Sequence, residues 1–247
     1  MSVGFDHIDT KECLARKIPV GFTPDILTDA TAELTIALLL ATSRRLLEAA
    51  SEVKSGGWGT WSPLWMCGSS LSGSTVGIVG MGRIGEAVSQ RIQSFGLSHL
   101  LYFSRNRKKD VERRLGAEFV SFEQLLEDSD FIIVCCTLSK DTNHLFNSWA
   151  FKKMKNSAVL INSSRGGVIN QEDLYSALCK GEIRAAGLDV TSPEPLPTDH
   201  PLLTLPNCVV LPHIGSATVE TRTAMAVLAA KNLLAGLKNQ PLLSQVC

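Results

Sequence analysis

The sequence lacks the features that mark several large classes of protein. Lysine and arginine together number 24, as do aspartate and glutamate, so the formal net charge is +0. A neutral chain does not have the basic surface that nucleic acids and anionic membranes attract. The longest apolar run, residues 34–41, is far shorter than the roughly 20 residues needed to span a bilayer. We therefore expect neither a nucleic-acid partner nor a membrane partner.

Cysteines are few, odd in number and without a metal-binding pattern. The 247 residues contain seven of them, with no CxxC pair and no Cys/His spacing typical of a metal site. An odd number of cysteines in a chain of this length favours reduced thiols, and no signal-peptide pattern opens the sequence. Cys135 and Cys136 lie in an apolar run, where buried structural cysteines are expected. The sequence therefore predicts a cytoplasmic protein without a metal site.

Short apolar runs rich in β-branched residues alternate with helical patterns along most of the chain. They cover residues 76–79, 100–103, 131–134, 158–161, 186–190 and 208–211. Strands that alternate with helices indicate a parallel sheet of the α/β class. The runs are continuous rather than alternating, which is typical of strands covered by helices on both faces. We predict a doubly wound parallel sheet of the Rossmann type.

The segments outside this alternation are mostly helical. Residues 28–54 contain neither glycine nor proline and predict one long or bent helix, and residues 218–237 predict a second long helix. Residues 6–9 read as a helix entry and residues 18–22 as a short strand. Only residues 1–27 precede the first long helix, too few for an independent core. The start of the chain therefore reads as the stub of a second domain.

Aromatic residues make up only 6% of the chain, yet three of its four tryptophans fall in one glycine- and proline-rich loop. They are Trp58, Trp61 and Trp65. Exposed aromatics on an arm often mark a contact between proteins. The alternative is a loop that folds back on its own domain. We predict a homodimer formed through the arm at residues 58–65.

A strand pattern leads directly into a GxGxxG motif at Gly80, Gly82 and Gly85, and helical spacing follows. Gly80 permits a tight turn, Gly82 lets the backbone approach a pyrophosphate, and Gly85 allows the helix to pack closely on the strand. The helix begins near Arg83 and Ile84, so its free amides and dipole would face the phosphates. The motif predicts a dinucleotide site in preference to a glycine-rich turn without a ligand.

No carboxylate stands at the end of the next strand, where an NAD site usually offers one to the ribose 2′-hydroxyl. Ser104, Arg105 and Arg107 stand there instead. A guanidinium carries a permanent charge and donates to phosphate in a fork, which suits the 2′-phosphate of NADP. The alternative is a solvated basic loop. We predict NADP(H) as the cofactor.

Three polar stretches each follow a predicted strand and contain Arg165, Glu194 and His213. Ligands of open parallel sheets bind beyond the carboxyl ends of the strands, so these side chains are expected to converge on the nicotinamide end of the dinucleotide. His213 could donate the proton when a 2-oxo acid is reduced, with Glu194 holding its ring. Arg165 could bind the substrate carboxylate and polarise the carbonyl. Taken singly, the histidine could be an ordinary hydrogen-bonded group and the glutamate part of a turn.

These motifs resemble the D-isomer-specific 2-hydroxyacid dehydrogenase family over essentially the whole chain. Within the family, the segments at residues 2–9 and 187–218 and the tryptophan arm are most similar to the glyoxylate and hydroxypyruvate reductases. The resemblance implies NADPH-dependent reduction of glyoxylate to glycolate and of hydroxypyruvate to D-glycerate. Two alternatives stay open: an NAD-dependent relative that acts on another 2-oxo acid, and a catalytically impaired NADP-binding or dimerising fragment.

The resemblance also assigns further residues. It implies that the amides of Val3 and Gly4 bind the substrate carboxylate and that Ser216 lies beside the site. It implies that Trp61 reaches the active site of the other subunit and that Thr137 lines the cofactor cleft. We also place Asp189, which follows a predicted strand, in the cofactor site.

The resemblance finally implies the domain organisation. Members of the family have on the order of a hundred residues before the position of Val3, about one domain's worth, and these form most of a flavodoxin-like substrate domain. We therefore expect remnants of that domain at residues 1–24 and 217–247. Residues 25–216 are expected to form the NAD(P)-binding domain, with the long helix and the dimerisation arm.

Overall fold

The chain folds around a central parallel sheet with helices on both faces. The computed structural model describes residues 2–247, and within them seven parallel strands lie in the order β3-β2-β1-β4-β5-β6-β7. The strands are β1 (Thr75–Val79), β2 (His99–Phe103), β3 (Glu118–Phe119), β4 (Phe131–Val134), β5 (Val159–Asn162), β6 (Ala185–Leu188) and β7 (Cys208–Val210). The doubly wound parallel α/β fold is confirmed. The edge strand β3 was not predicted because its two residues are exposed and form no apolar run.

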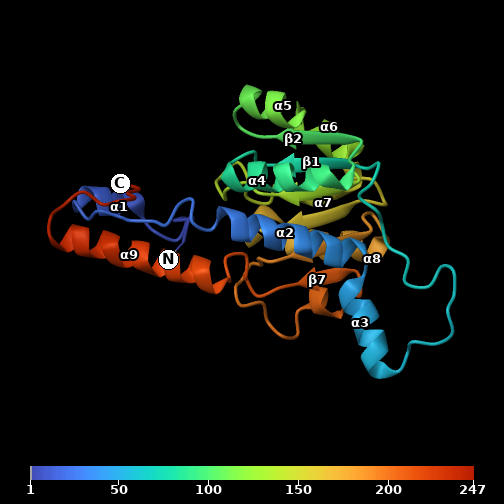
Figure 1. Cartoon of the computed structure of the whole chain (residues 1–247). Helices are drawn as coiled ribbons and strands as arrows, with labels where there is room; N and C mark the ends of the chain where they lie inside the picture. The colour runs from blue at the N-terminus through green and yellow to red at the C-terminus, as the bar shows by residue number, and fades with distance from the viewer. Residues whose placement is uncertain (1) are drawn as a thin grey trace.

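Most of the helices cover the two faces of the sheet in separate groups. The helices of the described residues are α1 (Thr10–Ala15), α2 (Thr28–Ser43), α3 (Leu46–Ser55), α4 (Arg83–Ile92), α5 (Lys109–Leu115), α6 (Phe122–Asp128), α7 (Ser148–Lys153), α8 (Gln171–Lys180) and α9 (Val219–Leu237), with 3-10 turns η1 (Gln93–Phe95), η2 (Gly166–Val168) and η3 (Pro201–Thr204). Leu38 of α2 and Val88 of α4 belong to the core on one face, whereas Leu125 of α6, Phe151 of α7 and Leu174 of α8 belong to the core on the other. Figure 1 shows α2 and α4 lying across the sheet.

The long helix expected over residues 28–54 is interrupted, so that prediction was only partly right. Helix α2 ends at Ser43 and α3 begins at Leu46, because Arg45 adopts the left-handed conformation with φ 54°. The carbonyl of Ser43 accepts a hydrogen bond from the amide of Ser69 at 2.8 Å, where a continuous helix would use it internally. The break therefore depends on a distant loop, which local sequence does not reveal.

The two ends of the chain lie together at one end of the molecule (Figure 1). The amide of Val246 donates to the carbonyl of Val20 at 2.8 Å, and a single antiparallel bridge joins Gly21 to Gln245. The strand predicted at residues 18–22 is therefore only this bridge. The buried Asn232 of α9 donates to the carbonyl of Phe22 at 3.2 Å, which fixes the helix to the N-terminal segment. The domain boundaries at residues 24 and 217 stay predictions.

The tryptophan arm extends away from the body of the molecule. Trp61 keeps 81% of its surface exposed and Trp58 keeps 67%. Figure 1 shows the chain after α3 looping out at the end opposite α9. The arm does not fold back on its own domain, so the alternative of an internal packing role is wrong. Within residues 2–247, none of the helices is long and apolar enough to cross a membrane.

Candidate active site

The glycine-rich turn after β1 has the geometry that a dinucleotide requires. Gly80 has φ 101°, and a Cβ placed on it would lie 2.5 Å from the backbone nitrogen of Cys136. A Cβ on Gly85 would overlap the carbonyl of Gly80, whereas a Cβ on Gly82 would meet nothing within 4 Å. The first and third glycines therefore close the turn, and the second leaves its backbone open to a phosphate. Helix α4 begins immediately afterwards at Arg83, so the turn fits a dinucleotide.

A cavity of about 500 Å³ lies beyond the carboxyl ends of the strands. The strand order reverses between β1 and β4, which is where ligands of doubly wound sheets bind. The predicted site residues that line the cavity are Val3, Gly4, Ile84, Thr137, Arg165, Asp189, His213 and Ser216. The fold thus brings together residues from the start, middle and end of the chain.

Arg165 is held by the loop that follows β5. The fully buried Asn162 donates to the carbonyl of Arg165 at 2.9 Å and accepts a hydrogen bond from the amide of Ser164 at 3.0 Å. A Cβ on Gly166 would overlap the carbonyl of Thr191, so this loop packs directly on the loop that carries the predicted catalytic glutamate. Close packing of the two loops places their polar side chains beside the same cavity.

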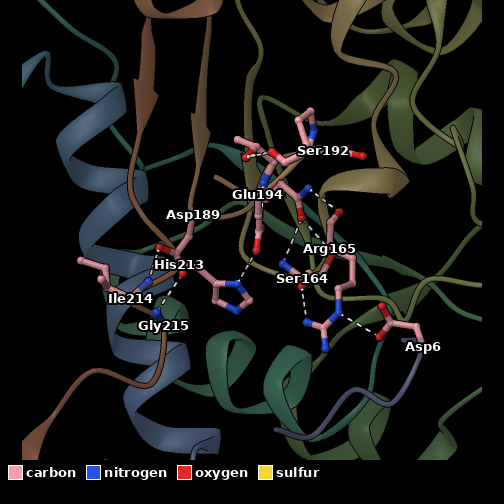
Figure 2. A network of polar contacts seen from close by, with 12 residues as sticks. Asp6, Ser164, Arg165, Asp189, Ser192, Glu194, His213, Ile214 and Gly215 are labelled. Carbon is pink, nitrogen blue, oxygen red and sulfur yellow. Dashed lines mark hydrogen bonds and ion pairs between the residues drawn. The ribbon is translucent and has the colours of Figure 1, made fainter. Parts of the chain in front are cut away.

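Figure 2 shows His213 and Glu194 as a hydrogen-bonded pair; His213 lines the cavity, whereas Glu194 does not. Nδ1 of His213 lies 2.9 Å from Oε2 of Glu194, and Oε1 of Glu194 accepts a hydrogen bond from the amide of Thr191 at 3.0 Å. Within residues 2–247, Nε2 of His213 has no hydrogen-bond partner. The carboxylate therefore orients the ring and leaves one ring nitrogen free for a substrate.

Asp189 fixes the backbone that carries His213. Its carboxylate oxygens accept hydrogen bonds from the amides of Ile214 and Gly215, both at 2.8 Å, and its carbonyl accepts one from the amide of His213 at 2.9 Å. Burial raises the pKa of Asp189, although these two side-chain hydrogen bonds act in the opposite direction. His213 has φ 53°, a conformation that costs free energy for a residue other than glycine. Asp189 therefore stabilises a strained loop that presents the imidazole.

Cys135 and Cys136 follow β4 and line the same cavity. Burial raises the pKa of Cys135 to about 12 and that of Cys136 to about 11. Both side chains are therefore neutral thiols at pH 7 and do not act as nucleophiles. All seven cysteines are free, as expected.

The comparisons with known proteins agree with this geometry. A model described as "D-isomer specific 2-hydroxyacid dehydrogenase, NAD binding domain" matches residues 36–215. The chain belongs to the D-isomer specific 2-hydroxyacid dehydrogenase family. It is 58% identical over 246 residues to proteins of Homo sapiens and Mus musculus named glyoxylate reductase/hydroxypyruvate reductase, and the match covers 100% of this chain and 75% of each relative.

A solved structure similar to this 2-hydroxyacid dehydrogenase chain is that of an NADPH-dependent glyoxylate/hydroxypyruvate reductase from Sinorhizobium meliloti, in complex with NADP and malonate. The TM-score is 0.89 at 36% sequence identity, and the alignment covers 100% of this chain and 76% of the other. The resemblance to the family inferred from the sequence is therefore confirmed.

The two arginines of the loop expected to bind the adenosine ribose differ in their contacts. Arg107 forks onto Glu112, with Nε to Oε1 at 2.8 Å and Nη2 to Oε2 at 2.9 Å. Within residues 2–247, Arg105 is exposed and forms no ion pair. The hydroxyl of Ser104 donates a hydrogen bond to the carbonyl of Asn106 at 2.6 Å. Of the two predicted arginines, only Arg105 is available to a ligand without first breaking an ion pair.

Several predicted site residues lie outside this cavity. Glu194, Ser104 and Arg105 do not line it, and Trp61 stands on the exposed arm, so its role in a second subunit stays a prediction. Arg83, at the first turn of α4, forms an ion pair with Asp25.

Sequence reasoning also missed several residues that line the cavity. They include Asp6, which pairs with Arg165, and Arg222 of α9, whose Nε donates to the carbonyl of Ser216 at 3.3 Å. Asp6 follows the Val3-Gly4 pair closely in sequence, but no motif marks it.

Proposed function

We propose that this chain reduces small 2-oxo acids, glyoxylate and hydroxypyruvate, with NADPH. The observation that carries the proposal is the placement of Arg165 and His213 on one cavity at the switch point of the sheet, with Glu194 hydrogen-bonded to the His213 ring. A cation and an oriented imidazole are the groups that carboxylate binding and proton donation require. The names of the mammalian and bacterial relatives support the substrate class and, for one of them, the cofactor.

The residues divide the work between them. When bound, NADPH would supply the hydride that the substrate's carbonyl carbon receives. Arg165, with the amides of Val3 and Gly4, holds the substrate carboxylate and polarises the carbonyl. His213 gives its Nε2 proton to the carbonyl oxygen as charge develops there, and Glu194 stabilises the protonated ring. The products are the 2-hydroxy acid and the oxidised cofactor.

The glycine turn and the loop after β2 would hold the cofactor. The backbone at Gly80, Gly82 and Gly85 and the start of α4 at Arg83 and Ile84 fit the pyrophosphate. Thr137 and Asp189 line the cavity farther along the same cleft.

The loss of NADPH absorbance on addition of glyoxylate or hydroxypyruvate tests this function directly. We expect turnover with both acids and much slower turnover with NADH. Turnover with NADH alone would favour an NAD-dependent member of the family. Cofactor binding without turnover would favour a non-catalytic role for the chain.

Arg105 is proposed to select NADPH. Its replacement with alanine is expected to weaken NADPH binding by about 1.5–3 kcal/mol, because a charge-assisted contact to the 2′-phosphate is lost. NADH binding should barely change. Arg107→Ala is a matched control: its guanidinium is held by Glu112, so its loss should affect NADPH less. Fluorescence titration of both variants with both cofactors measures this, and equal losses for NADPH and NADH in Arg105→Ala would show a structural role instead.

The tryptophan arm is proposed to form a homodimer in which Trp61 approaches the active site of the second subunit. Its exposed aromatic surface is unusual for a monomer. Simultaneous replacement of Trp58, Trp61 and Trp65 with alanine should yield a monomer in sedimentation-velocity experiments. Trp149→Ala is the control, because this exposed tryptophan lies on α7, outside the arm. A triple variant that stays dimeric would contradict the assignment.

A further inference from the structure

Arg165 lies between two segments that are far apart in the sequence. Nε donates to Oδ1 of Asp6 at 3.0 Å, and Nη1 donates to the carbonyl of Ser164 at 2.8 Å. Figure 2 shows the guanidinium between these two partners. A Cβ placed on Gly4 would coincide with Nη2, so that nitrogen lies directly against the Gly4 backbone. Within residues 2–247, Nη2 is the guanidinium nitrogen without a hydrogen-bond partner.

The ion pair between Arg165 and Asp6 contributes little to the stability of the fold. The side chains of Arg165 and Asp6 are 28% and 35% exposed. Partly exposed pairs of this kind contribute little to the free energy of unfolding. Asp6 is nevertheless ionised: burial raises its pKa, but the hydrogen bond from Arg165, a backbone hydrogen bond at Asp6 and the charge of Arg165 together hold the pKa below its usual value. The clearest consequence of the contact is therefore geometric, because it fixes the rotation of the guanidinium.

We propose that Asp6 is a positioning residue for the 2-oxo acid: by holding Nε of Arg165, it turns Nη2 toward Gly4 to receive the substrate carboxylate. This inference rests on the function proposed above, in which Arg165 and the Gly4 amide bind that carboxylate. Asp6 accepts the hydrogen bond from Nε, and among residues 2–247 this leaves Nη2 without a hydrogen-bond partner and open to the substrate carboxylate. Gly4 admits no side chain here because a Cβ would fill the place of Nη2.

Two replacements separate the hydrogen bond of Asp6 from its charge. Asp6→Asn removes the charge and keeps an acceptor oxygen for Nε, whereas Asp6→Ala removes both. The probe is oxamate, a carboxylate that resembles a 2-oxo acid and is not reduced, titrated calorimetrically into the NADPH-saturated chain. We expect Asp6→Ala to bind oxamate about tenfold more weakly than Asp6→Asn does, since one aligned charge-assisted contact is lost.

Two controls test whether Asp6 affects oxamate binding through Arg165. Glu12→Gln removes a carboxylate of the same N-terminal segment whose partner, Arg16, lies outside the cavity, and it should leave oxamate binding unchanged. In an Arg165→Ala background, Asp6→Ala should have no further effect, because its action passes through the guanidinium. NADPH binding and the midpoint of thermal unfolding should be the same in both Asp6 variants.

The outcomes distinguish this inference from the proposed function. Oxamate binding by Asp6→Ala equal to or tighter than that of Asp6→Asn would overturn the positioning role, as would an undiminished effect in the Arg165→Ala background. If Arg165→Ala alone left oxamate binding unchanged, or if the unmodified chain bound no oxamate, the proposed role of Arg165 would fail and this inference with it.

Discussion

Replacement of His213 with glutamine is expected to lower kcat for the reduction of glyoxylate by about 10²–10⁴-fold, the usual effect of losing a general acid. The imidazole is oriented by Glu194 at 2.9 Å and keeps Nε2 free beside the cavity, so it can deliver a proton to a carbonyl oxygen. Glutamine has an amide that can donate a hydrogen bond but cannot transfer a proton. The KM for NADPH should change little, because none of the three glycines of the turn lines the cavity that the ring borders.

The pH profile gives a second measurement for His213. Reduction consumes one proton, which the imidazole is proposed to deliver, so the rate of the unmodified chain should fall at high pH, where protons are scarce. His213→Gln should lose that descending limb together with most of its turnover. His99→Gln is the control: His99 starts β2, at the opposite edge of the sheet from the cavity. Near-normal turnover and an unchanged profile in His213→Gln would exclude it as the proton donor.

Much of this site could be predicted because it obeys a topological rule. Every strand of a doubly wound sheet ends at the same edge, so polar residues that directly follow predicted strands are expected to meet. Arg165 and His213 meet in this way, and the chain brings them to one cavity. The glycine turn could be predicted for a similar reason, since Gly80 and Gly85 satisfy local steric requirements that the spacing alone encodes.

The features that were missed depend on contacts between distant segments. At the break near Arg45, the amide of Ser69 donates a hydrogen bond to the carbonyl of Ser43, which a continuous helix would bond internally. The helical pattern of residues 28–54 gives no sign of this distant contact. The pair between Arg165 and Asp6 spans 159 positions, and a lone aspartate near the N-terminus carries no motif. Likewise, the sequence placed Arg105 and Arg107 together, whereas the ion pair with Glu112 separates their roles. Side-chain pairing follows from the folded structure and not from spacing.

Replacement of Arg165 with alanine is expected to raise the KM for glyoxylate and to lower kcat in the same variant. The guanidinium is proposed both to bind the substrate carboxylate and to polarise the carbonyl, so one deletion removes ground-state binding and transition-state stabilisation together. Each charge-assisted contact contributes about 1.5–3 kcal/mol, which predicts a combined loss in kcat/KM of at least about 10²-fold. Arg165→Lys should restore little activity, because an ammonium group cannot keep Nε on Asp6 while a second nitrogen faces Gly4.

The loss in Arg165→Ala should be confined to the 2-oxo acid. NADPH binding, followed by fluorescence, should stay near that of the unmodified chain, because neither the three glycines of the turn nor Arg105 lines the cavity that Arg165 borders. Arg16→Ala controls for the loss of an arginine that pairs with an acidic residue, since Arg16 is exposed and pairs only with Glu12 among residues 2–247. Steady-state kinetics with glyoxylate decide the matter: a variant with normal KM and normal kcat would remove Arg165 from the active site, whereas a rise in KM alone would limit it to substrate binding and leave carbonyl polarisation to His213.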